Sequence, residues 1–219
     1  MIRVWSGCFQ EREGRDEKNE ENTFKGGGNP MTDFRDLMRL RRSVRDYEDR
    51  EVPVSLVREL IADACEAPSA SNRQPCGFVV VADRDMMRRL SDESKKNLLN
   101  DMKTLKSPML RLYRPVLKDE NFNVFYNAPC LMYITGPRDL HSAVKDCSLA
   151  ASYLMLSAAD RGLGTCWVDL GSSIQDPEIL AELHISEDQQ IVATIILGYP
   201  REIPQRPPRS EPKILTIIG

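Results

Sequence analysis

Three short runs of apolar residues, set between longer stretches of helical pattern, constrain the fold of this chain most strongly. They cover residues 77–82, 131–135 and 191–197. A continuous apolar run of this length is typical of a strand buried on both faces of a sheet. Residues 165–168 predict a shorter strand, and residues 214–218 could form a final one.

Helical spacing fills the intervals between these runs. The predicted helices cover residues 32–40 (with Thr32 as N-cap), 53–67, 84–97 (a polar surface helix), 142–161 and 177–184. The helix over 142–161 is the clearest, with Leu149, Tyr153, Leu156 and Ala159 on one stripe and Gly162 at its end. Its nearly apolar middle predicts a central helix buried on most sides. Alternating helices and strands indicate an α/β or α+β fold with a mixed sheet.

Charge and hydropathy exclude several classes of function. The 219 residues carry 30 Lys and Arg against 33 Asp and Glu, a net charge of −3. This balance gives no reason to expect nucleic-acid or anionic-membrane binding. No apolar run approaches the roughly 18 residues that span a bilayer, and the N-terminus has no apolar core of a signal peptide. We therefore expect a soluble, cytoplasmic protein.

Cysteine and histidine supply little evidence for a metal or a nucleophile. The six cysteines form no CxxC pair and are scattered along the chain, and neither histidine lies in an HExxH motif. There is no GxSxG elbow either. We predict free thiols, no metal site and no catalytic side chain.

Two segments differ from the regular pattern. Residues 1–30 are highly charged and end in a triple glycine and Pro30, which predicts a disordered extension, with translation from Met31 as an alternative. Residues 98–128 contain apolar residues broken by two prolines and predict one or two short helices and a loop that cover the domain. The domain itself is then residues 31–219.

Three segments could bind a polar ligand. Residues 41–45 place three arginines and a serine within five positions, and arginine forks suit phosphate oxygens. Residues 68–75 form a turn rich in hydroxyl and amide groups, which could hydrogen bond a polar heterocycle. Residues 162–169 hold a GxG after the longest helix. Each segment also has a structural interpretation: a basic helix end, an ordinary Asn/Ser-rich turn and a glycine cap.

Together, and in this order, these segments resemble the FMN-dependent nitroreductase family. The resemblance is carried by RRSVRDY, by APSASNRQP before an apolar strand, by DCSLAASYLMLSAADRGLGTCWV, and by ILGYP before a proline-rich tail. It covers nearly all of residues 31–219, with residues 98–128 the least matched. It implies an α+β three-layer sandwich with a mixed β-sheet, assembled as an intertwined homodimer with two FMN sites at its interface.

The resemblance also implies which residues contact FMN. The phosphate and ribityl chain would be held by Arg41, Arg42, Ser43 and Arg45, with Arg209 from the tail. The flavin of the opposite subunit would be met by Pro68, Ser69 and Ala70, in a loop shaped by Asn72 and Gln74. The isoalloxazine would lie along Trp167, Val168, Asp169 and Leu170, with a backbone N–H near N5 and with Asp146 close by on the central helix. Residues 98–128 would be a variable lid.

Two positions depart from the family pattern. Cys76 replaces the aromatic residue that often follows the Gln-Pro pair, and Tyr153 stands where an asparagine is usual. Either change could alter flavin packing or substrate preference, while no phosphate ligand is lost. Cys76 could also be a reactive thiol.

The implied activity is transfer of a hydride from NAD(P)H through flavin N5 to a nitroaromatic, quinone or similar small acceptor, by a ping-pong mechanism. A flavin-dependent reductive dehalogenase is the alternative within the same fold. A non-catalytic flavin-binding regulator, or a structural protein without cofactor, are alternatives from other classes.

Overall fold

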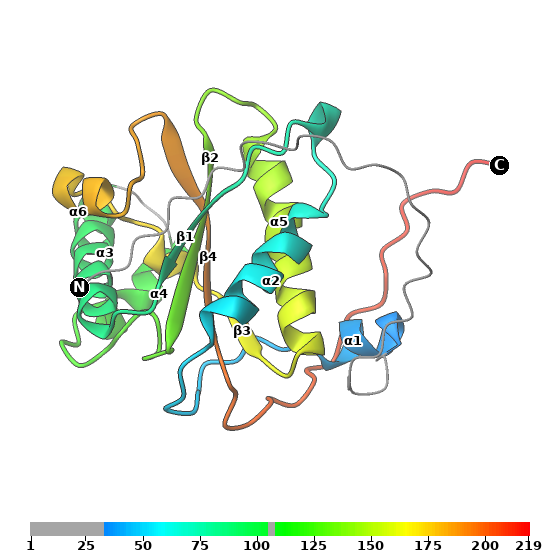
Figure 1. Cartoon of the computed structure of the whole chain (residues 1–219), viewed down its shortest axis with the longest axis horizontal. Helices are drawn as coiled ribbons and strands as arrows, with labels where there is room; N and C mark the ends of the chain where they lie inside the picture. Colours follow the sequence, from blue (N-terminus) through cyan, green and yellow to red (C-terminus); the bar gives the residue numbers. More distant parts are fainter. Residues whose placement is uncertain (1–32, 105–107) are drawn as a thin grey trace.

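The computed structural model describes residues 33–104 and 108–219, so the predicted extension over residues 1–30 and the Thr32 cap lie outside the described residues. One sheet is flanked by helices on both faces, as Figure 1 shows. This arrangement confirms the predicted α+β fold with three layers. Helix α1 (Phe34–Leu40) starts the described chain, and the side chain of Asp33 caps it by accepting from Arg35 N–H at 2.7 Å.

The sheet has four strands in the order β1-β2-β4-β3. The strands are β1 (Gly77–Val81), β2 (Cys130–Pro137), β3 (Gly164–Trp167) and β4 (Gln189–Gly198). All three strand pairings are antiparallel. The parallel component of the predicted mixed sheet is confined to an isolated bridge between Ser43 and Thr165.

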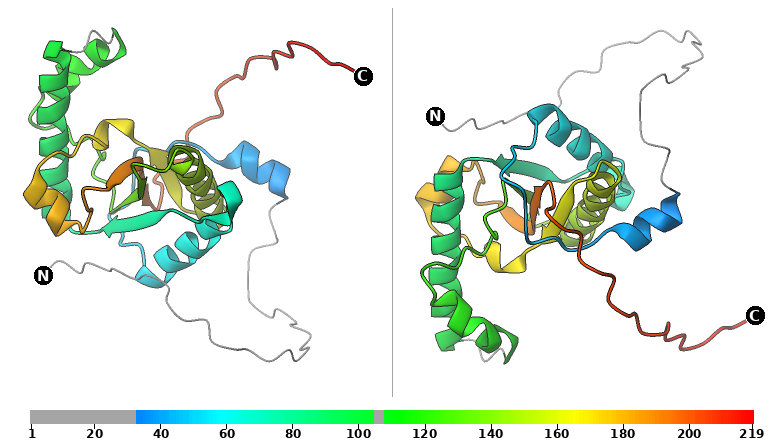
Figure 2. Two further views of the ribbon diagram at one scale, coloured as in Figure 1. Left: turned by 90° about the horizontal axis from the view of Figure 1, so that it is seen from above. Right: turned by 90° about the horizontal axis from the view of Figure 1, so that it is seen from below.

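Two helical layers cover the two faces of this sheet (Figures 1 and 2). One face carries α2 (Val54–Cys65) and α5 (Ala143–Asp160), and the other carries α3 (Arg84–Thr104), α4 (Pro108–Leu117) and α6 (Pro177–Glu182). Two short 3-10 turns, η1 (Ala70–Asn72) and η2 (Asp169–Gly171), follow α2 and β3.

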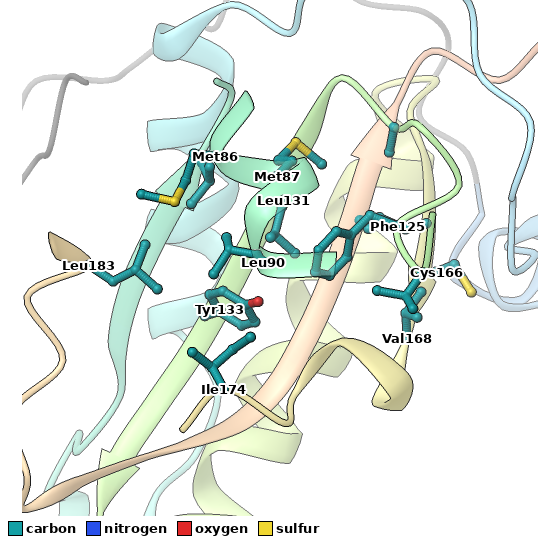
Figure 3. Close-up of a cluster of buried hydrophobic side chains, with 14 of the residues drawn as sticks. Met86, Met87, Leu90, Phe125, Leu131, Tyr133, Cys166, Val168, Ile174 and Leu183 are labelled. Atoms are coloured by element: carbon teal, nitrogen blue, oxygen red, sulfur yellow. The ribbon is translucent and has the colours of Figure 1, made fainter. Parts of the chain in front are cut away.

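Side chains alternate between two cores along the central strands. In β2, Leu131 and Tyr133 point to the α3 side, whereas Met132 and Ile134 point to the α2 and α5 side. Figure 3 shows the first of these cores, with Leu90 of α3 packed against Leu131 and Tyr133. Period-two alternation of this kind is what a sheet covered on both faces requires.

Two predictions about this region were wrong. Helix α3 is not a polar surface helix over residues 84–97, because it continues to Thr104 and buries Met86, Met87 and Leu90. Strand β1 is not buried on both faces: it lies at the sheet edge and most of its residues are half-buried. Pattern alone cannot distinguish an edge strand from a central one, since both carry apolar residues.

Helix α5 buries a different face from the predicted stripe. Leu149 and Tyr153 are each 42% exposed, while small residues such as Ala150, Ala151 and Ala158 are buried. Small side chains let a helix approach the sheet closely, which increases dispersion contacts. The large apolar residues are therefore left on the outer face of this single chain.

The predicted cover over residues 98–128 is only partly a surface element. Leu112, Tyr113 and Val116 of α4 are exposed, and the end of α3 with α4 projects from the body in Figure 2. Val124 and Phe125, however, are fully buried in the core. The loop that follows α4 therefore contributes to the core, whereas α4 has a largely exposed face.

The tail after β4 has no regular structure, and residues 214–218 do not form the predicted strand within this chain. Residues 201–219 are exposed, and the C-terminal part of this tail runs away from the body (Figure 2). Ile217 and Ile218 are 83% and 90% exposed. In residues 33–104 and 108–219, no helix has both the length and the apolar character needed to cross a membrane.

Candidate functional site

The segment over residues 41–45 is held as an extended chain beside β3. Arg41 caps α1, its N–H donating to Leu37 O at 3.0 Å, and Val44 N–H then donates to Thr165 O at 3.0 Å. Gly164 permits this approach, because a Cβ there would lie 2.7 Å from a Val44 methyl carbon. The arginine segment is thus fixed by backbone contacts, and Arg42 Nη1 also donates to the Arg41 carbonyl oxygen at 2.6 Å.

The positive charges of Arg41, Arg206 and Arg209 act on the guanidinium of Arg42, and these four residues are here called the arginine cluster. Burial lowers the pKa of Arg42, and the positive charges of the other three lower it further. Within residues 33–104 and 108–219, none of the four forms an ion pair. The Arg42 Nε atom is buried without a hydrogen-bond partner in the same described part of the chain. The cluster is therefore a site of uncompensated positive charge.

Arg45 and Ser43, from the same segment, contact neighbouring side chains. Arg45 lies over the Tyr126 ring, with its guanidinium carbon 5.7 Å from the ring centroid. Burial raises the pKa of the Cys166 thiol, and a hydrogen bond from Ser43 and the charge of Arg45 act against that rise. Sequence reasoning missed Arg206 and Tyr126. The Arg-Pro-Pro-Arg spacing of the tail was a signal for Arg206, whereas Tyr126 had none.

The polar loop, residues 68–75, is built by strained backbone and local hydrogen bonds. Ser71, Asn72 and Gln74 have φ angles of 52°, 52° and 49°, which non-glycine residues seldom adopt. Gln74 N–H donates to Ser69 Oγ at 2.9 Å, and Gln74 Nε2 donates to Asn72 Oδ1 at 2.9 Å. Asn72 and Gln74 therefore take part in the hydrogen bonds within the loop. Strain of this kind clusters at functional sites.

Asp146 anchors this loop to the N-terminal part of α5. Its Oδ1 accepts from Ala70 N–H at 3.1 Å, and the residue is only 5% exposed. Its Oδ2 is buried without a partner among the described residues. Asp146 thus lies with the polar loop and not with the arginine cluster.

Residues 167–170 continue from β3 into η2. Val168 N–H donates to Thr194 O at 2.8 Å, and Leu170 O accepts from Ser94 Oγ at 2.6 Å. These bonds fix the backbone on the sheet side. The amides of Asp169 and Leu170 open the 3-10 turn, where N–H groups have no partner within the turn. The segment therefore presents backbone donors.

The arginine cluster and the polar loop lie at opposite ends of α5. The loop contacts Asp146 in the first turns of the helix, whereas Ser43 and Val44 pair with Thr165, which follows its C-terminal end. Figure 1 shows η1 and β3 at these two ends. A helix of 18 residues is about 27 Å long. The predicted site residues therefore form two groups that do not meet within one chain.

Comparison with known proteins gives this arrangement a context. A protein of Methanothermobacter thermautotrophicus, provisionally named an NADH dehydrogenase/NAD(P)H nitroreductase, is 28% identical over 177 residues, which are 78% of this chain and 80% of that protein. A nitroreductase of Bacteroides fragilis solved with bound FMN has a TM-score of 0.71 at 22% identity, covering 86% of this chain and 99% of the other. An iodotyrosine deiodinase bound to FMN and 3-iodo-L-tyrosine has a TM-score of 0.65 at 20% identity, covering 82% and 96%.

The two solved structures show that the fold is shared. The sequence match is more specific, since residues 38–199, from α1 to the residue after β4, match the sequence model of the nitroreductase family. The chain belongs to the nitroreductase family.

Proposed function

We propose that this protein is an FMN-dependent oxidoreductase that passes a hydride from NAD(P)H to a nitroaromatic, quinone or similar small acceptor. The observation that carries the proposal is the arginine cluster, formed by Arg41 and Arg42 with Arg206 and Arg209 of the tail. In a chain of the nitroreductase family, a dense positive site without counter-charge calls for an anionic ligand.

The donor set suits a phosphate monoester. Arginine presents a planar fork of N–H donors that matches phosphate oxygens. Arg42 brings a buried Nε without a partner in the described chain, and such a group is stabilised when a ligand accepts from it. Ser43 adds a hydroxyl beside the cluster. These residues would hold the FMN phosphate.

A second chain would complete the site. The polar loop is separated from the arginine cluster of its own chain by the length of α5. Large apolar side chains that a soluble monomer seldom exposes together lie on α1, α5 and the tail, among them Phe34, Tyr153 and Leu215. A homodimer that buries these residues would bring the loop of one chain to the cluster of the other.

When bound, FMN supplies the hydride chemistry. The protein residues would position the ring and stabilise charge: cationic groups near the flavin would stabilise negative charge on the ring, and the N–H groups of Asp169 and Leu170 would offer donors to a ring nitrogen. No side chain is needed as a nucleophile. NAD(P)H and the acceptor would use the same cleft in turn, which predicts parallel lines in double-reciprocal plots.

Reconstitution with FMN tests this proposal directly. The purified protein should bind FMN and show flavin absorbance, and Arg42→Ala should weaken binding by about tenfold or more, because a charged hydrogen-bond donor is removed. The matched control is Arg39→Ala, an exposed arginine on α1 that pairs only with Asp36 in the described structure. Equal FMN affinity in the two variants would contradict the phosphate assignment.

An acceptor screen distinguishes the alternatives. NADH or NADPH oxidation that depends on a nitroaromatic or quinone supports the proposed activity. Turnover of an iodinated phenol alone would favour a dehalogenase, and a flavin-loaded protein without any turnover would favour a binding protein.

A further inference from the structure

Two cysteine thiols lie in contact where the polar loop meets α5. The Sγ atoms of Cys76 and Cys147 are 3.4 Å apart, although 71 positions separate them in the sequence. Cys76 directly precedes β1, and Cys147 lies in the first turns of α5, next to Asp146. Both sulfurs are therefore attached to rigid elements.

Close backbone packing holds the pair in place. Cys147 Sγ lies 3.4 Å from the Thr135 carbonyl oxygen, and a Cβ at Gly136 would come within 2.9 Å of that sulfur. A Cβ at Gly77 would lie 2.6 Å from Thr135 Oγ1. The missing side chain at Gly136 leaves space for the Cys147 sulfur, and the missing side chain at Gly77 lets β1 lie close to Thr135. Cys147 is fully buried and Cys76 is half-buried, so a small reagent reaches Cys76 first.

The hydrogen bond makes the two thiols unequal. Cys76 donates to Cys147 Sγ, and this bond, burial and the Asp146 charge raise the pKa of Cys76. Accepting the same bond lowers the pKa of Cys147. When the pair loses one proton, that proton leaves Cys147, and the remaining proton stays on Cys76 in its hydrogen bond to the Cys147 sulfur.

We propose that Cys76 and Cys147 form a redox-active dithiol site, which a peroxide-class oxidant converts reversibly into a disulfide between the polar loop and α5. The inference rests on the sulfur contact and is independent of flavin binding. A sulfur–sulfur bond measures about 2.05 Å, so bond formation requires only a small approach of two sulfurs that already touch.

The chemistry balances with hydrogen peroxide as oxidant. In the singly deprotonated pair, the proton moves along the hydrogen bond from Cys76 to Cys147, which makes the accessible Cys76 the thiolate. This thiolate attacks one peroxide oxygen, the O–O bond breaks and hydroxide leaves, which gives a sulfenic acid on Cys76. The hydroxide takes the Cys147 proton, and the Cys147 thiolate attacks Cys76 Sγ and displaces a second hydroxide. The two sulfurs lose two electrons and the peroxide gains them. A dithiol such as dithiothreitol reverses the oxidation.

The disulfide would hold the loop at both ends. Asp146 already holds the Ala70 end, and a bond from Cys147 would fix the Cys76 end. Neighbouring residues of α5 would then clamp a loop whose side chains are mostly exposed.

Thiol counting and peptide mapping of the full chain test the inference. Oxidation with stoichiometric hydrogen peroxide should remove two of the six thiols measured after denaturation, and a Cys76–Cys147 linked peptide should appear. Dithiothreitol should restore all six. Retention of six thiols, irreversible oxidation of Cys76, or a bond between two chains would overturn the proposal.

Substitution of one cysteine at a time identifies which thiol pairs with Cys76. Cys65 is the matched control, because it is an exposed cysteine close to Cys76. Partial burial is the main cause that raises the pKa of Cys65, and the charge of Cys76 raises it further. Cys65→Ser should still lose two thiols, whereas Cys76→Ser and Cys147→Ala should not form the linked peptide. A Cys65–Cys76 disulfide in the wild-type map would overturn the proposal even if a buried variant failed to fold.

Discussion

The arginine cluster and the polar loop differ in almost every physical respect. The cluster concentrates positive charge on Arg41 and Arg42, whose segment is fixed to β3, and on two arginines of the tail. The loop has neutral side chains except Arg73, three non-glycine residues with positive φ, and a single buried carboxylate as its anchor. The proposed function assigns an anion to the first region, and to the second a polar group with both donors and acceptors.

This difference explains why the two groups can lie at opposite ends of α5. A phosphate and a heterocycle are distinct parts of one flavin nucleotide, so one chain can supply the charge and its partner the neutral contacts. Each region is then incomplete in isolation. Changes to the tail, to Gly164 and to Asp146 should affect the two regions to different extents.

Removal of the tail after Glu202 should have the largest effect. The variant loses Arg206 and Arg209 from the cluster, together with exposed apolar residues such as Ile217. We expect both FMN binding and dimer formation to be lost, measured by flavin fluorescence and by light scattering with size-exclusion chromatography. A truncated protein that remains a dimer with full FMN affinity would show that the tail serves neither region.

Gly164→Ala should destabilise the arginine side by about 1–3 kcal/mol, because the added Cβ overpacks against Val44. Gly162→Ala is the matched control two residues away: it has open space around it, although its φ of +74° costs an alanine about 1–2 kcal/mol. Urea unfolding gives both values. FMN affinity should fall in Gly164→Ala alone, since only that variant moves the arginine segment, and equal affinity in both would contradict this account.

Asp146→Asn should have the smallest effect, on the loop side. The charge-assisted bond from Ala70 N–H becomes a neutral one, which lowers the unfolding free energy by about 1 kcal/mol. Faster hydrogen exchange of the Ala70 amide should accompany the loss. Asp160→Asn, at the exposed end of the same helix, serves as control and should change neither quantity.

Local patterns sufficed for several elements of the fold, but not for the predicted strand over residues 214–218. The strands at residues 131–135 and 191–197 and the helix over 142–161 were predicted because their apolar runs and spacing are strong. Patterns failed where burial depends on the neighbouring layer. The buried face of α5 and the edge position of β1 are set by packing across the sheet, which no single segment encodes.

The candidate site was predicted from motifs, and their arrangement in space was not. The resemblance pointed to Arg41, Arg42, Ser43, Arg45 and Arg209 as one group. In the structure, the charges of Arg41 and Arg209 both lower the pKa of Arg42, after burial as the main cause. The sequence could not reveal the Cys76–Cys147 contact or the separation of Asp146 from the arginines, because each depends on contacts between segments distant in the chain.

Complementation between two damaged chains tests the central claim that each site combines the arginine cluster of one chain with the polar loop of the other. One chain carries Arg42→Ala and the other carries Ala70→Pro. The proline removes the N–H that donates to Asp146 Oδ1, and the extended backbone of Ser69 is compatible with a following proline. Each variant alone should bind FMN weakly. Mixed dimers should regain one tight FMN site per dimer, since one of the two sites is undamaged. Mixed dimers without a tight site would show that each site is built within one chain.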